Sequence, residues 1–356
     1  MSELRYRRAG AHDAVRSHHH VSRRRLAAIA CMVVVLATTV LLDVLTGPAG
    51  LTLFDVLGTL LHPEAADPTL RTIVWTFRLP TALMALLVGA ALGIAGAEMQ
   101  TILNNPLASP FTLGVSAAAS LGAALAIVLG SLSQLIPSEF LIPVNAFLWA
   151  LLGAAAIYGI GRIRGGSTET VVVGGVALHF LFSSGVAFLQ YVASEDALQS
   201  IVFWIFGSLQ GASWSRLGIL ATVVALAIAL LLSRAWRLTA LRLGDEHARS
   251  LGIEVQRLRL QTLVLISVLT ATAVCFAGAI GFIGLVAPHL ARMAVGEDQR
   301  FFLPMSAIYG ALLVSVAALV SKAVLPGTVF PIGIATAAIG APFFAGVALL
   351  KRRAYW

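Results

Sequence analysis

Long apolar runs and short polar connections alternate along most of the chain. Nine runs approach the length of about 20 residues that a helix needs to cross a membrane. They are Leu26–Leu45, Leu79–Ala97, Leu113–Leu129, Leu141–Ile160, Val171–Val192, Leu217–Leu232, Thr262–Ile280, Phe302–Val320 and Ile332–Leu350. A tenth, Phe282–Met293, is shorter and contains Pro288. The runs are continuous and do not alternate with period two, so they predict helices and not the strands of a barrel.

The composition agrees with a membrane protein. Hydrophobic residues make up 59% of the 356 residues and charged residues only 11%, against about 45–50% and about 25% in soluble domains. We therefore expect a basic N-terminal tail over residues 1–25, a transmembrane domain over residues 26–350 and a C-terminal tail over residues 351–356. His18–His20 lie in the basic tail, where disorder is favoured over metal binding, and no metal site is predicted.

The net charge of +8 follows the membrane topology. Basic residues gather before the first run, after the fourth, between the sixth and seventh, after Phe282–Met293 and at the C-terminus, whereas the alternate connections hold few cations. The positive-inside rule then places both termini in the cytoplasm, which requires an even number of crossings and favours ten. A nucleic-acid partner is not expected.

Small residues are spaced by four in the second run, at Gly89, Gly93 and Ala97. Such spacing lets helix backbones approach closely in lipid, so a tightly packed bundle is expected.

The longest polar cytoplasmic stretch covers residues 233–260. Between Gly244 and Gly252 its composition predicts a short helix that ends at a glycine, and this helix would offer a docking surface to another protein. The sequence has no phosphate-binding loop of the form GxxxxGK[ST]. We therefore expect no enzyme activity and no cofactor on this chain, with ATP and magnesium bound by a partner.

Ionisable groups inside apolar runs are costly in lipid and are candidates for function. Asp43 lies near the outer end of its run and is expected at the interface. Glu98, near Gln100 and Asn105, either caps a polar cluster or lines the inner exit of a path. His179 lies deep in its run, where it either makes a hydrogen bond between helices or lines a path. Pro106 breaks the chain after the second run.

Four segments resemble the FecCD-type permeases, which import iron-siderophores, haem and cobalamin. They are RLPTALMALLVGAALGIAGAEMQTILNNPLASPFTLGVS (Arg78–Ser116), LGDEHARSLGI (Leu243–Ile253), AGAIGFIGLVAPHLARMAVGEDQRFFLPMSAIYGA (Ala277–Ala311) and FPIGIATAAIGAPFFAGVALL (Phe330–Leu350). Their order matches the family and they span the chain from Arg78 onward.

The resemblance implies an all-α, ten-helix permease of the type II fold of ATP-binding-cassette (ABC) importers, in the inner membrane. It implies a dimer with a second permease, identical or not, two cytoplasmic ATPase subunits and an extracytoplasmic substrate-binding protein. The segment that couples to the ATPases would comprise Leu243, Gly244, Asp245, Glu246, His247, Ala248, Arg249, Leu251 and Gly252. Path candidates are Glu98, Gln100, Asn105, Pro106, His179 and Trp204.

The sequence departs from the family pattern at its predicted outer docking face. Arg78 and Lys322 are the candidates for contacting the binding protein, but Thr81 replaces a second arginine and Lys322 itself replaces an arginine. Ala318 and Val329 stand where the family has acids. Lysine offers a point charge and not a bidentate fork.

Two other classes of function compete with the importer. A secondary transporter would use Glu98 and His179 as an ion relay, although intramembrane carboxylates are scarce. A membrane-embedded enzyme lacks a constellation of nucleophile and base. Within the importer class an iron-siderophore complex is the expected cargo, and haem and cobalamin are the alternatives.

Overall fold

The computed structural model describes residues 2–47, 49–130, 137–163, 168–324 and 330–350. Within these ranges the chain is helical and contains no strand. The helices are α1 (Ser2–Leu45), α2 (Leu53–Leu61), α3 (Pro68–Thr72), a π-helical segment (Ile73–Arg78), α4 (Leu79–Ile102), α5 (Val115–Leu129), α6 (Ser138–Ile163), α7 (Thr168–Val192), α8 (Glu195–Phe206), α9 (Trp214–Leu232), α10 (Ala235–Leu241), α11 (Asp245–Ser250), α12 (Val255–Ala277), α13 (Ile283–Val295), α14 (Gln299–Ala323) and α15 (Ile332–Leu350). The C-terminal tail, residues 351–356, lies outside the described residues.

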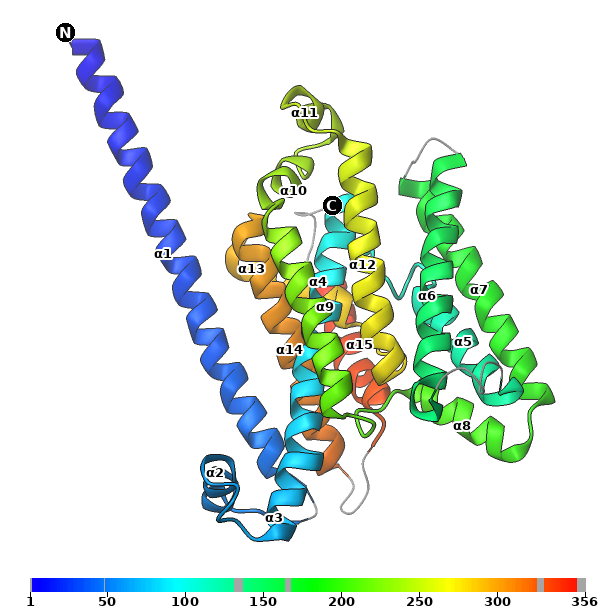
Figure 1. The fold of residues 1–356 in the computed structure, drawn as a ribbon. Coiled ribbons are helices and arrows are strands. Elements are labelled where there is room, and N and C mark those ends of the chain that lie inside the picture. The colour runs from blue at the N-terminus through cyan, green and yellow to red at the C-terminus, as the bar shows by residue number, and fades with distance from the viewer. Residues whose placement is uncertain (1, 48, 131–136, 164–167, 325–329, 351–356) are drawn as a thin grey trace.

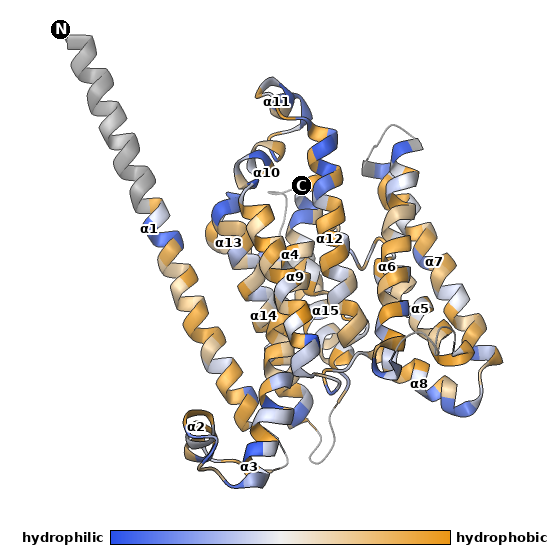
Figure 2. Ribbon diagram, in the orientation of Figure 1, coloured by the Kyte–Doolittle hydropathy of each residue, from blue (hydrophilic) through white to orange (hydrophobic). Residues whose placement is uncertain are grey.

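Ten of the described helices are apolar enough to belong in a membrane. Seven are long enough to cross it, and α5, α13 and α15 are shorter apolar helices. The middle of the bundle is hydrophobic, and hydrophilic residues lie at its two ends (Figure 2). The predicted all-α membrane fold with ten helices is therefore confirmed.

Three stretches outside the predicted apolar runs are helical in the structure. Helix α1 begins at Ser2, so the segment expected as a disordered tail is its first part. Helix α2 begins at a capping box in which Thr52 and Asp55 satisfy each other's backbone N–H groups. Helix α8 begins at Ser194, whose hydroxyl accepts from Ala197 N, with acids in the first turn.

The helices form two groups with α1 at one edge (Figure 1). Helix α4 lies at the centre of the first group, against α9, α12, α13 and α14, and most of it is buried. Helices α5, α6, α7 and α8 form the second group, which meets the first mainly through α6 and α12. Helix α1 contacts chiefly α14.

The backbones of α4 and α14 approach each other closely. A Cβ atom added at Gly310 would lie 2.1 Å from the carbonyl oxygen of Gly89, and one at Gly89 would lie 2.3 Å from that of Gly310. One turn further, a Cβ at Gly93 would lie 2.3 Å from Ser306 O. The close approach predicted from the glycine spacing is confirmed, and we call this contact the glycine seam.

Gly310→Ala should destabilise the protein because neither backbone can move away without opening the seam. We expect a loss of about 1–3 kcal/mol, the usual cost of overpacking a core, measured as a lower midpoint of thermal unfolding in detergent. Gly218→Ala on α9 is the matched control, since a Cβ there meets nothing within 4 Å. Equal midpoints for the two variants would contradict the seam.

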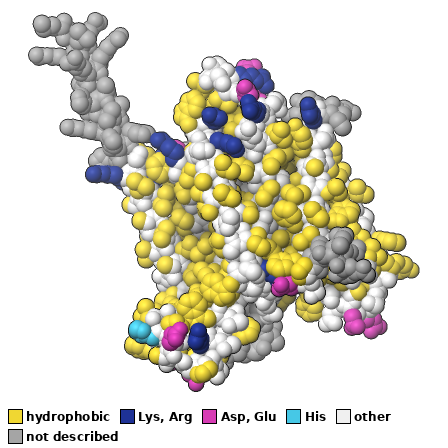
Figure 3. Space-filling view, in the orientation of Figure 1, with side chains coloured by type: hydrophobic (Ala, Val, Ile, Leu, Met, Phe, Trp, Pro, Cys, Tyr) yellow, Lys and Arg dark blue, Asp and Glu magenta, His cyan; other side chains and the backbone are white. Residues whose placement is uncertain are grey.

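Charged side chains lie at both ends of the bundle. Lys and Arg side chains gather at the end where α10 and α11 lie, with some Asp and Glu among them, and Asp and Glu side chains also appear at the end of α3 and α8 (Figure 3). We call these the basic end and the opposite end. Helix α1 starts at the basic end. Two ion pairs join it to the two ends of α14, Arg25–Asp298 at 3.7 Å and Asp43–Lys322 at 2.9 Å.

Candidate functional site

Helix α11 forms a projection at the tip of the basic end (Figure 1). Two glycines with positive φ bound it, Gly244 at +105° and Gly252 at +79°, because the chain turns sharply there and only glycine adopts such φ values without strain. Ala248 is fully buried, whereas Leu243 is 67% exposed and Leu251 is 50% exposed. The predicted helix between the two glycines is confirmed, and it presents apolar side chains that no described part of this chain covers.

Arg259 on α12 connects this projection to the centre of the bundle. Its Nη1 and Nη2 donate to the two carboxylate oxygens of Asp245 at 2.8 Å each, a bidentate pair. Its Nε donates to the carbonyl oxygen of Ile102, at the last turn of α4, at 2.8 Å. One guanidinium therefore joins α11, α12 and α4. Sequence reasoning missed Arg259, which is one of several arginines in this segment.

A polar network surrounds the basic end of α4. Arg292 on α13 donates to Gln100 Oε1 at 2.9 Å and pairs with Glu297 at 3.0 Å. Arg242, which precedes α11, pairs with the same Glu297 carboxylate. The amide of Gln299 donates to the Thr101 hydroxyl at 2.8 Å. The network holds α4, α13, α14 and the connection to α11 together.

Glu98 lies one turn before this network and is fully buried. Neither of its carboxylate oxygens has a hydrogen-bond partner among the described residues. Asn105 accepts a hydrogen bond from Leu107 N at 2.9 Å, so with Pro106 it shapes the turn that follows α4.

His179 and Trp204 lie in the second group of helices. His179 packs on Phe111 and Phe180, with ring centroids 6.3 and 5.9 Å away. Trp204 is half-buried on α8, and its carbonyl lies against Gly278. None of the six path candidates lines either of the two larger cavities described below, and the structure does not bring all six together. Their role in a path between two permeases stays a prediction.

The opposite end holds a buried cluster of charges. Lys322 donates to the carboxylate of Asp43 at 2.9 Å and to its carbonyl oxygen at 3.0 Å. Asp43 is fully buried in the chain, where Lys322 neutralises its charge; its expected position at the membrane interface stays a prediction. Arg78 is 8% exposed and donates to Thr46 O. Both predicted docking residues thus already have partners within the chain, and their contact with a binding protein stays a prediction.

Three of the departures from the family pattern meet at one place. Thr81, Ala318 and Lys322 line a cavity of about 240 Å³ at the opposite end, together with residues around Gly207. Ala318 stands where the family has an acid, and in this chain Asp43 on α1 supplies the negative charge that pairs with Lys322. Val329, the fourth departure, lies outside the described residues.

Ten apolar helices with a short helix projecting from the basic end are the architecture of a polytopic membrane protein. The sequence model of the FecCD transport family matches residues 33–352. The chain therefore belongs to the FecCD transport family.

Individual relatives agree with this family. The cobalamin import system permease of Halobacterium salinarum is 40% identical over 279 residues, 78% of this chain and 73% of that protein. The hemin transport system permease of Yersinia pestis is 35% identical over 280 residues, 78% of this chain and 84% of that protein. A solved metal-chelate type ABC transporter, in an inward-facing conformation, is 32% identical with a TM-score of 0.80; the match covers 91% of this chain and 99% of that one.

Proposed function

We propose that this chain is the membrane subunit of an ABC importer that carries a metal chelate into the cytoplasm. An iron-siderophore complex is the cargo we favour, and haem and cobalamin are the alternatives. The cargoes named for the relatives support this class, since cobalamin, haem and metal chelates are all organic complexes built around a metal.

The observation that carries the proposal is the connection from α11 through Arg259 to α4. An importer needs a surface for its ATPase and a rigid route from that surface to the core. The exposed Leu243 and Leu251 supply apolar surface for the ATPase. The bidentate pair of Asp245 and Arg259 transmits the movement of α11 to α4.

The remaining parts of the importer are partners. Two ATPase subunits would bind ATP and magnesium at the basic end, and a second permease, identical or not, would complete the path. An extracytoplasmic binding protein would deliver the cargo at the opposite end. Helix α1 starts at the basic end, so the positive-inside rule supports a cytoplasmic N-terminus in the inner membrane.

The test is chelate-stimulated ATP hydrolysis by the chain reconstituted with its ATPase and binding protein in proteoliposomes. Leu243→Glu and Leu251→Glu should each lower the stimulated rate at least fivefold, because a charge replaces apolar contact at the ATPase surface. Leu61→Glu at the opposite end is the matched control, since that leucine is 72% exposed. Gradient-driven uptake by the chain without an ATPase would contradict the proposal.

A further inference from the structure

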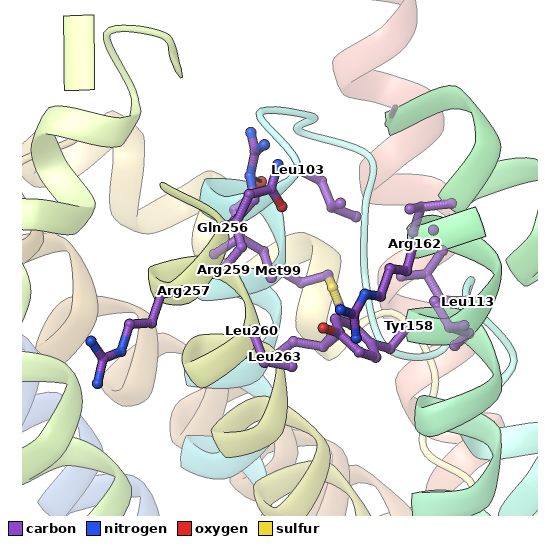
Figure 4. Close-up of a pocket in the computed structure, with 14 residues that line it drawn as sticks. Met99, Leu103, Leu113, Tyr158, Arg162, Gln256, Arg257, Arg259, Leu260 and Leu263 are labelled. Atoms are coloured by element: carbon purple, nitrogen blue, oxygen red, sulfur yellow. Dashed lines mark hydrogen bonds between the residues drawn. The ribbon is translucent and has the colours of Figure 1, made fainter. Parts of the chain in front are cut away.

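A cavity of about 550 Å³ separates the two groups of helices near the basic end. One wall comes from the last turn of α4 and the first turns of α12, and the other from the end of α6 and the start of α7 (Figure 4). Its volume is within the range of about 300–1,000 Å³ that is usual for ligand pockets. The coupling route described above runs past the cavity but does not fill it.

The deeper part of the cavity is apolar. Met99, Leu113, Ile157, Val171, Leu260 and Leu263 line it. On α12 the lining runs over eight residues, from Gln256 to Leu263, and so extends about 10 Å along the helix axis. A polar or multiply charged ligand would lose its hydration along this wall without gaining hydrogen bonds.

Three arginines line the cavity, and only one of them is available to a ligand inside it. Arg259 is held by Asp245 and by the Ile102 carbonyl. Arg257 pairs with Glu254 at 3.5 Å and points away from the cavity in Figure 4. Arg162, in the last turn of α6, points into the cavity toward Met99 and makes no ion pair with the residues that the structure describes.

A cation beside an apolar wall, with no ion pair to any residue that the structure describes, matches the chemistry of an anionic phospholipid. The Arg162 guanidinium can donate to a headgroup phosphate, with the Tyr158 hydroxyl beside it (Figure 4). The acyl chain would lie along the apolar wall below. Basic pockets between helices at the cytoplasmic side of a membrane are suited to acidic headgroups.

We propose that this cavity is a binding site for one anionic phospholipid, with the phosphate on Arg162 and an acyl chain between α6 and α12. The lipid would come from the leaflet at the basic end. Naming this leaflet cytoplasmic rests on the orientation proposed above, whereas the site and its test do not depend on orientation, cargo or ATPase.

The test is native mass spectrometry of the full chain, purified in detergent with its partner subunits and supplied with equal amounts of phosphatidylglycerol and phosphatidylcholine. The unmodified protein should retain phosphatidylglycerol in preference. Arg162→Gln should reduce this preference about fivefold, since each basic side chain near an acidic headgroup raises the binding affinity by about that factor. Arg257→Gln is the matched control, because this arginine lies at the same cavity but points away, and it should keep the preference.

A second variant tests the acyl-chain part of the site. Leu263→Trp fills the cavity and should reduce retention of both lipids, whereas Val264→Trp on the exposed side of the same turn should not. Equal retention of the two lipids by the unmodified protein would overturn the proposal. So would equal losses in Arg162→Gln and Arg257→Gln, or displacement of the lipid by inorganic phosphate or by the transported chelate. Arg162→Gln changes only a half-exposed rim residue, so the proposal can be tested even if Leu263→Trp does not fold.

Discussion

Arg259→Lys is expected to lower chelate-stimulated ATP hydrolysis and transport by the assembled importer at least tenfold, with the fold intact. Lysine keeps the charge but cannot donate simultaneously to both oxygens of Asp245 and to the Ile102 carbonyl. Hydrogen bonds to charged groups contribute about 1.5–3 kcal/mol each when shielded from water, and about 1.4 kcal/mol corresponds to a factor of ten. Because the Arg259 side chain is 22% exposed, we expect each hydrogen bond to contribute near the lower end of this range, and the rate to fall about tenfold.

The control for this change is Arg257→Lys. Arg257 lies two residues away, and its ion pair with Glu254 is exposed on both sides, so surface effects alone should change the rate little. Asp245→Asn should resemble Arg259→Lys, and the double variant should be no worse than either single variant, because all three break the same connection. Fully additive losses would show that the two residues act separately.

Lys322→Met is expected to destabilise the folded chain by about 3–5 kcal/mol, because it leaves the fully buried carboxylate of Asp43 without its partner. The double change Asp43→Leu with Lys322→Met should recover most of this loss, since apolar residues of similar volume replace the pair. The measurement is the thermal unfolding midpoint in detergent for the two single variants and the double variant.

The same variants separate a structural role of Lys322 from the predicted docking role. If the double variant is stable and still responds to the binding protein, the lysine serves to hold α1 on α14. If it is stable but the binding protein no longer stimulates ATP hydrolysis, the docking prediction is supported. A single variant Lys322→Met as stable as the unmodified protein would contradict the structural role.

Most of the fold could be predicted because lipid imposes it. An apolar run near 20 residues has few alternatives to a helix, and the two glycines around α11 mark a short helix in any context. Helices α2 and α8 were missed although their starts carry local signals, the capping box at Thr52 and the Ser194 cap followed by acids.

The site was less predictable because its key contacts join distant residues. Asp43 and Lys322 are 279 positions apart, and nothing local to either indicates the other. Arg259 looks like its basic neighbours in the sequence, and only the packing of α12 on α4 selects it. Gly310, the partner of Gly89 in the seam, is the only glycine in its run, and the small residue four positions before it is Ser306.

The glycine seam also limits how the permease can move. Helices α4 and α14 touch backbone to backbone, and a Cβ at Gly96 would similarly lie 2.0 Å from the carbonyl of Gly284 on α13. Such interlocked surfaces neither slide nor rotate in small steps, so α4, α13 and α14 must turn as one rigid body during a transport cycle. Relative movement is then left to the boundary between the two groups of helices, where the cavity of about 550 Å³ lies between α12 and α6, and its occupancy would change how easily this boundary closes.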